Sequence, residues 1–189
     1  MHNWTELAND IKKCQKCAGL NSDRYGTQNA PGYGSKTSSV VIIGQSLCGI
    51  PCIKSQIPFT GGSGVLLDEA FKRINIEKKD IYITNVVKCH PPGNRKSETH
   101  EIENCSPFLD KELDWLKPTH IICLGKDAWR SFDKTIKKPT SKKNKNTIIH
   151  FMYHPSYIKR KSKDVQNDYI NNISTIIQES RNSVTHSTC

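Results

Sequence analysis

Short apolar runs rich in β-branched residues recur along this chain, and each ends at glycine or at polar residues. They occupy residues 39–44, 80–85, 119–125 and 147–152. Runs of this length are typical of buried strands in a parallel sheet. Apolar residues at helical spacing fill 65–74 and 99–116 between them. Strands that alternate with helices predict an α/β fold, with a parallel sheet covered by helices on both faces.

The flanking segments have simpler patterns. Trp4, Leu7, Ala8 and Ile11 predict an amphipathic N-terminal helix, and a final helix is expected over about 165–181. Segment 19–38 is rich in Gly, Asn, Ser and Thr and is expected to be loop. Segment 134–146 carries six lysines and is expected to be a solvated loop. The length favours a single domain over residues 1–189.

Polar residues gather where the expected strands end. These ends are 44–46, 84–85, Gly125 and 153–154. Because ligands bind beyond the carboxyl ends of parallel strands, we expect the functional site at this edge of the sheet.

The charge balance bears on partners. Lys and Arg number 28 against 18 for Asp and Glu, a formal net charge of +10. This balance favours a polyanion such as nucleic acid, although a merely soluble basic protein fits it equally well. Neither a secretory signal nor a membrane span is evident, so we expect a cytoplasmic, reducing location, no membrane partner, and a monomer without an obligate protein partner.

Four cysteines form a candidate metal set. Cys14 and Cys17 make a C-x2-C pair, and Cys89 and Cys105 stand far along the chain. In a reducing compartment such residues are more often metal ligands or buried side chains than disulfides. Four thiolates hold either zinc or a [4Fe-4S] cluster, and spacing does not choose between them. Bare chemistry places zinc slightly ahead.

Three other cysteines have separate expectations. Cys48 and Cys52 form a C-x3-C pair beside the first strand. Without further ligands nearby, they are expected to be free thiols lining a pocket. Cys123 lies inside an apolar strand and is expected in the core.

Taken in order, the motifs become specific. They are C-x2-C, VIIGQ, PFTGGSGVLLD, ITNVVKCHPPGNR, EIENC, IICLGKDA and YHPSY. Over about residues 11–158 this series resembles the iron–sulfur, family-four branch of the uracil-DNA glycosylases. The resemblance implies a three-layer α/β/α fold with a four-stranded parallel sheet. It also implies a [4Fe-4S] cluster, in place of zinc, ligated by Cys14, Cys17, Cys89 and Cys105.

The resemblance assigns three base-handling roles. Phe59 matches the aromatic residue on which the family stacks a flipped base, and Asn85 the amide that reads the O4 and N3 edge. His154 matches the donor to the base O2, which stabilises charge that appears in the transition state. Taken alone, Phe59 is more typical of a core residue and His154 of a structural histidine, and Asn85 also fits a capping or turn asparagine.

Further residues are expected to contact DNA. Gly62 and Ser63 precede a helix and suit a phosphate. The segment after His154 offers an apolar wedge with cations to hold the backbone. The expected contacts there and in a separate loop are Tyr157, Ile158, Lys159, Arg160 and Arg95. No matched lysine implies a Schiff base, so a free base and an abasic site are the expected products.

The first motif departs from the family. It runs Gly44-Gln45-Ser46-Leu47-Cys48, with no carboxylate before Asp68. The resemblance implies a glutamate at Gln45, a small residue at Ser46 and further acids beyond, which would position water or stabilise the sugar cation. Gln45 could orient water by hydrogen bonding but supplies no negative charge, and Gln45 and Ser46 are the catalytic candidates of this motif. Cys48 lies near the position that tests the pyrimidine C5 substituent.

Three functions follow as hypotheses. The first is excision of uracil from DNA. The second is excision of a modified or hypermodified pyrimidine, such as modified cytosine in phage DNA, as an antiviral defence. The third is a non-catalytic DNA-binding module on the same scaffold.

Overall fold

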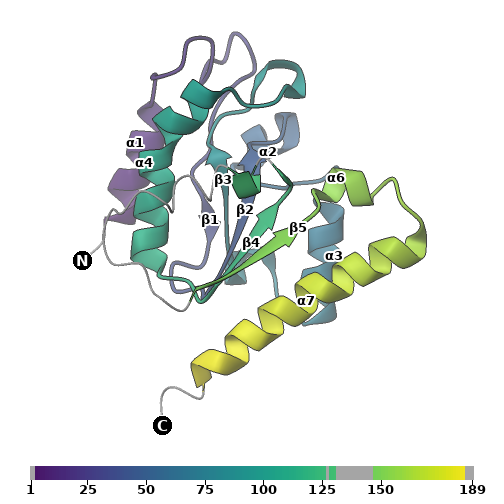
Figure 1. Ribbon diagram of the computed structural model, residues 1–189. Helices are drawn as coiled ribbons and strands as arrows, with labels where there is room; N and C mark the ends of the chain where they lie inside the picture. The colour runs from purple at the N-terminus through teal and green to yellow at the C-terminus, as the bar shows by residue number, and fades with distance from the viewer. Residues whose placement is uncertain (1–2, 127, 131–146, 186–189) are drawn as a thin grey trace.

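A five-stranded sheet in the order β1-β3-β2-β4-β5 organises the molecule (Figure 1). The computed structural model describes residues 3–126, 128–130 and 147–185. The strands are β1 (Tyr33–Gly34), β2 (Val40–Ser46), β3 (Tyr82–Val87), β4 (His120–Leu124) and β5 (Ile148–Met152). Strands β2 to β5 pair in parallel, and only β1 is antiparallel to its neighbour, β3.

Helices cover both faces of this sheet (Figure 1). The longer ones are α1 (Trp4–Lys13), α3 (Val65–Arg73), α4 (Thr99–Leu116) and α7 (Lys163–Thr185). The shorter elements are α2 (Ile50–Ser55), α6 (Pro155–Ile158) and the 3₁₀ turns η1 (Lys78–Asp80) and η2 (Pro92–Asn94). Helices α3 and α7 pack on one face, and α1 and α4 pack on the other.

The alternation along β2 sets these two apolar layers. Val40 and Ile42 join the layer under α3 and α7, whereas Val41 and Ile43 join the layer under α4. All four side chains are at most 1% exposed. Because successive side chains of a strand point to opposite faces, a continuous apolar run is what a strand covered on both faces requires.

The structure confirms the α/β class and the four parallel strands, and it corrects one boundary. Residues 33–34, expected within a loop, form the short strand β1 against Tyr82 and Ile83. Two residues are too few to show an alternating pattern in sequence. Cys123 is buried in the core, as expected. The expected basic loop at 134–146 and Cys189 lie outside the described residues.

Within the described part of the chain, no helix combines the length and the apolar character needed to cross a membrane.

Candidate active site

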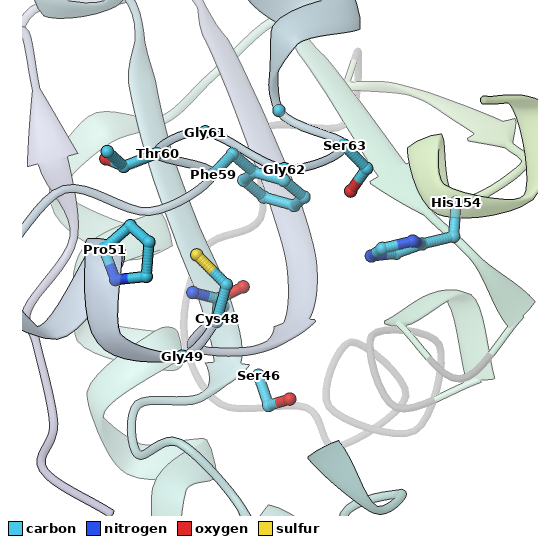
Figure 2. Close-up of a pocket in the computed structure, with 12 residues that line it drawn as sticks. Ser46, Cys48, Gly49, Pro51, Phe59, Thr60, Gly61, Gly62, Ser63 and His154 are labelled. Atoms are coloured by element: carbon cyan, nitrogen blue, oxygen red, sulfur yellow. The ribbon is translucent and has the colours of Figure 1, made fainter. Parts of the chain in front are cut away.

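A cavity of about 240 Å³ opens at the carboxyl ends of β2 and β3 (Figure 2). The loop after β2, the glycine-rich segment before α3 and the residue that caps α6 complete its wall. The lining residues are Ser46, Cys48, Gly49, Pro51, Phe59, Thr60, Gly61, Gly62, Ser63, Gly64, Asn85 and His154. The sequence placed the site at this edge of the sheet, and the cavity is found there.

Asn85 supplies an available acceptor to the cavity. Its side chain is 3% exposed overall, and its Oδ1 atom has no hydrogen-bond partner among the described residues. An unpaired buried acceptor costs free energy unless a ligand satisfies it. Gly44 on β2 makes this position possible, because a Cβ there would collide with Asn85 Oδ1 and lie 2.6 Å from Phe59 Cζ.

Phe59 provides an aromatic wall held by its backbone. Its φ of 57° lies in the left-handed region, which side-chain-bearing residues rarely adopt. Lys78 Nζ donates to the Phe59 carbonyl at 3.0 Å, and Lys78 is itself paired with Asp68 at 2.8 Å. The Phe59 ring centroid lies 6.1 Å from that of His154. The cavity therefore has a fixed ring on one side and an imidazole on the other.

The orientation of His154 follows from two bonds to Ser156. The Ser156 backbone N–H donates to His154 Nδ1 at 3.2 Å, and the Ser156 hydroxyl lies 2.7 Å from the same atom. Because Nδ1 accepts the backbone N–H, the proton of the neutral ring resides on Nε2. Burial lowers the pKa of His154, which favours this neutral form. In Figure 2 the imidazole points into the space below the Phe59 ring.

The two expected first-motif residues lie on different sides of β2. Ser46 lines the cavity, but Gln45 is absent from the described residues that line it. Gly44 and Ser46 share a face of β2, so Gln45 between them faces the opposite side of the sheet. The structure thus brings Ser46 to the other site residues and leaves Gln45 away from them.

Cys48 and Cys52 form a disulfide, which corrects the expectation of free thiols. Their Cα atoms lie 5.5 Å apart. Cys48 faces the cavity, as expected, while Cys52 is fully buried and its sulfur accepts from the Thr60 backbone N–H at 3.3 Å. This pair therefore links the loop after β2 to the loop that carries Phe59.

The four cysteines expected to ligate metal converge beside β3. Cys14 ends α1, Cys89 follows β3, and Cys105 lies on α4. Cys17 packs with Cys89 and Cys105 in one buried cluster. Cys17 also accepts from Asn104 Nδ2 at 3.4 Å.

The surroundings of this cysteine cluster favour neutral thiols. The pKa of Cys89 is raised to about 12, first by burial and then by the neighbouring thiols of Cys105, Cys14 and Cys17. Burial also raises the pKa of Cys105. Metal ligation requires thiolates, so bound cations would have to offset this cost. Across the described residues, no three or more His, Cys, Asp or Glu side chains have the geometry of a metal-ion site.

Short contacts connect the cysteine cluster to the cavity. The Leu47 backbone N–H donates to the Cys89 carbonyl at 3.2 Å, and His90 Nδ1 lies 3.0 Å from the Leu47 carbonyl oxygen. Leu47 stands between two lining residues, Ser46 and Cys48. The position of the cavity wall therefore depends on the segment that carries Cys89.

A buried ion pair supports β3 beneath the cavity. Lys88 Nζ lies 2.7 Å from a Glu112 carboxylate oxygen, and the two side chains are 2% and 1% exposed. The same ammonium donates to Thr84 Oγ1 at 2.6 Å and to the Asn85 carbonyl at 2.9 Å. The sequence pattern did not predict this pair, although a lysine directly before Cys89 in an apolar stretch was a usable signal.

The residues after His154 are arranged differently from the expected wedge. Ile158 is 4% exposed and packs in the core against α3 and α7, so it is not an exposed wedge. One turn of α6 carries it inward, because Pro155 and Ile158 are the buried residues of that turn. Tyr157 is the exposed apolar residue, at 40%. Tyr153 and Phe151, which the sequence pattern did not single out, are also exposed beside it.

The three basic residues expected to contact DNA differ in their contacts within the protein. Lys159 Nζ donates to the Gly62 carbonyl at 2.9 Å and joins α6 to the glycine-rich segment that includes Ser63. Arg160 is exposed. Arg95 pairs with Glu101 at 2.6 Å and with Glu98 at 3.3 Å, at the start of α4. Its guanidinium therefore pairs with the two carboxylates that form the capping box of α4.

Comparison with known proteins agrees with this architecture. The family model described as "Uracil DNA glycosylase superfamily" matches residues 31–175, well over half of the chain. The chain belongs to the uracil DNA glycosylase superfamily. The match runs from just before β1 into α7 and so includes all the strands and the whole cavity wall.

Three curated relatives of this superfamily member carry the name "Type-4 uracil-DNA glycosylase". The Archaeoglobus fulgidus protein is 34% identical over 68% of this chain and 62% of its own length. The Pyrobaculum aerophilum protein is 40% identical over 61% of this chain and 57% of its own. The Sulfurisphaera tokodaii protein is 32% identical over 82% and 76%. The match thus spans less than two thirds of the first two relatives.

Proposed function

We propose that this protein is a monofunctional DNA glycosylase that removes a flipped pyrimidine, with uracil as the first candidate. The observation that carries the proposal is the unpartnered Asn85 Oδ1, buried in a cavity between the Phe59 ring and the His154 imidazole. The similarity to proteins named uracil-DNA glycosylases supports the same conclusion.

Base recognition would use the unsatisfied amide. A base in a duplex is accessible only after it leaves the stack, and the enzyme then reads its edge and stacks its face. Asn85 Oδ1 would accept the N3–H of uracil, and its amide N–H would donate to O4. Phe59 would stack against the ring. Binding therefore removes an energetic cost that the empty site carries.

Bond breakage would depend on the imidazole of His154. As the C1′–N1 bond breaks, its electron pair leaves with the base, and positive charge develops on the sugar. The Nε2–H of neutral His154 would donate to the base O2, where negative charge collects. Water then adds its oxygen to C1′, and its proton neutralises the departing base. The products are a free base and an abasic site.

Among the described residues, no carboxylate takes part in the cavity wall. The described lining residues contain neither Asp nor Glu. In our proposal Ser46 orients the water through its hydroxyl, and the phosphates of the DNA stabilise the sugar cation. Gly62 and Ser63 would face a phosphate, with Tyr157, Lys159 and Arg160 beside the same strand. Arg95 and Gln45 are weaker candidates, given where their side chains lie.

We propose a [4Fe-4S] cluster held by Cys14, Cys17, Cys89 and Cys105. Cys17, Cys89 and Cys105 pack in one cluster, and Cys14 is close enough to raise the pKa of Cys89, so the four thiols are grouped as ligands of one cluster require. When bound, the cluster supplies positive charge that keeps the thiolates ionised, and it crosslinks distant segments.

A second candidate substrate is a modified cytosine, as in phage DNA, which would make the enzyme an antiviral defence. The wall made by Cys48, Gly49 and Pro51 motivates it, because small or rigid residues there leave space beside the base. An acceptor such as Asn85 Oδ1 suits a cytosine N4 amino group as well as a uracil N3–H.

One assay separates these functions. Oligonucleotides containing uracil, hypoxanthine or modified cytosines are incubated with the protein, and abasic sites are then cleaved with alkali. Breaks at uracil support the first proposal, and breaks only at modified cytosine support the second. Binding without breaks would mean a non-catalytic DNA-binding module. His154→Ala is the matched variant and should lower base release by about 100- to 1,000-fold without loss of DNA binding.

Iron and sulfide analysis tests the cluster. We expect about four irons per chain, with the broad visible absorption of an iron–sulfur centre. Cys105→Ala should lose most of the iron, whereas Cys123→Ala, a buried cysteine of β4, should keep it. Zinc in place of iron in the parent protein would refute the assignment.

A further inference from the structure

Three aromatic rings are exposed on and beside the last strand of the sheet. Phe151 is 44% exposed, Tyr153 is 58% exposed, and Tyr157 on α6 is 40% exposed. β5 is an end strand of the sheet, so no described strand pairs with its outer edge. Large exposed rings that gather in one place commonly mark a binding surface.

These rings form a continuous series beside His154, which lines the cavity. Ring centroids are 6.3 Å apart for Trp129 and Phe151, 5.7 Å for Phe151 and Tyr153, and 5.2 Å for Tyr153 and Tyr157. Tyr153 and Tyr157 stand on either side of the segment that begins with His154. The aromatic series is therefore continuous with the proposed active site.

The backbone holds the rings outward. Phe151 and Tyr153 are two residues apart on extended chain, so their side chains share a face, while Met152 between them packs into the core. The buried Tyr169 of α7 donates its hydroxyl to the Tyr153 carbonyl at 2.8 Å. This bond fixes the backbone that presents the Tyr153 ring, which lowers the conformational entropy lost when a planar partner binds.

Cations accompany the series. Lys161 Nζ lies 4.5 Å from the centroid of the Tyr157 ring, and the exposed Lys159 and Arg160 precede it. Exposed rings beside a row of cations are the arrangement with which proteins bind single-stranded nucleic acid, because every base has a face to stack and every phosphate a charge.

We propose that Phe151, Tyr153 and Tyr157 stack unpaired bases of single-stranded DNA that leads into the cavity at His154. The inference rests on the proposed function in one respect, that the bound strand carries the nucleotide to be processed. It adds a preference for unpaired DNA, which the cavity alone does not imply.

Fluorescence anisotropy with a labelled single-stranded oligothymidine and a duplex of equal length tests the surface. Tyr153→Ala and Phe151→Ala should each weaken single-strand binding by about tenfold, within the range for one base–aromatic stack, and should leave duplex binding within about twofold. Tyr153→Trp should retain the affinity, because tryptophan also stacks. All three variants should keep the parent's thermal midpoint, since the rings are exposed.

Tyr25→Ala is the matched control. Tyr25 is also 58% exposed and lies beside a cation, Arg24, whose guanidinium carbon is 5.4 Å from its ring. The proposal would be overturned if Tyr25→Ala lost as much single-strand affinity as the test variants, or if both test variants kept the parent's single-strand affinity. It would also be overturned if the test variants lost as much affinity for the duplex as for the single strand. So would a dimeric parent that Tyr153→Ala makes monomeric, because the rings would then bind a second copy. Base release measured in parallel keeps the two proposals apart: binding can depend on the rings even where no base is excised.

Discussion

Asn85 on β3 and Lys88 just beyond its end are both buried polar residues, but they differ in their hydrogen bonds. All the partners of one are present, whereas an atom of the other has none among the described residues. Lys88 is 2% exposed, and its ammonium contacts Glu112, Thr84 and the Asn85 carbonyl. Asn85 is 3% exposed, yet its Oδ1 has no partner in the described part of the protein. The same segment thus holds a fully satisfied charge and an unsatisfied amide.

This difference suggests separate roles for the two residues: Lys88 stabilises the fold, and Asn85 is kept for binding a base. A satisfied buried network rigidifies the structure around it, and losing one member leaves an unpaired charge. An unsatisfied acceptor at a cavity wall adds nothing to folding and is retained at a cost. We therefore expect substitutions at Lys88 to act on stability and substitutions at Asn85 to act on binding and turnover.

The sharpest test of the supporting side is Lys88→Met. It leaves the Glu112 carboxylate buried without its partner and should lower the free energy of unfolding by about 3–5 kcal/mol, measured by urea denaturation. The double variant Lys88→Met, Glu112→Leu should recover part of this loss. Lys79→Met, which breaks the exposed Lys79–Glu77 pair, is the control and should leave the midpoint unchanged. Equal midpoints for Lys88→Met and the parent would refute the supporting role.

Asn85→Ala tests the recognition side. The variant should lower base release by at least about 100-fold, since the edge of the base loses its partner, as removal of one preorganised hydrogen-bonding group does elsewhere. Its free energy of unfolding should change by less than about 1 kcal/mol, because no intramolecular hydrogen bond to Oδ1 is lost. Single-turnover assays and denaturation of the same preparation measure both. A strongly destabilised variant with full activity would reverse the comparison.

Gly44→Ala should lower both the stability and the rate of base release, each by less than the substitutions above. The added methyl group meets Asn85 Oδ1 and the Phe59 ring, and overpacking of this kind costs about 1–3 kcal/mol. Activity should fall as the amide and the ring are displaced. Gly49→Ala is the matched control in the same wall, because a Cβ there comes no closer than 3.7 Å to His90. If Gly44→Ala matches this control in both assays, the packing argument fails.

The smallest expected effect is a displaced pH profile. Burial lowers the pKa of His154, so the neutral ring persists below the ordinary histidine value of about 6.5. The stability that this ring contributes is present above its unfolded pKa and is lost as the pH falls through the folded pKa. The base-release rate should accordingly be flat through pH 6.5 and fall only in more acidic solution. An inflection at or above that value in single-turnover rates would contradict the assigned neutral donor.

Much of the fold could be predicted, because strands that are buried on both faces of a sheet consist of short continuous apolar runs. The four parallel strands and the helices at 65–74 and 99–116 agree with the structure to within two residues or so. The meeting of Ser46, Asn85 and His154 also followed, since the carboxyl ends of parallel strands share one edge.

Other features depend on how the backbone turns locally, which the order of apolar and polar residues does not show. Ile158 adjoins basic residues, but one turn of helix rotates it into the core. The Cys48–Cys52 pairing arises where the chain begins α2 and brings residues four apart together. The position of Gln45 was recoverable, because its parity along β2 is opposite to that of Gly44.

The contact between Lys159 and the Gly62 carbonyl has a consequence for substrate range. It joins α6 to the glycine-rich segment of the cavity wall, and under the proposed function it would limit how far these two elements can separate around a bound nucleobase. To admit larger bases, we would therefore first remove the Lys159–Gly62 hydrogen bond, before enlarging the cavity itself.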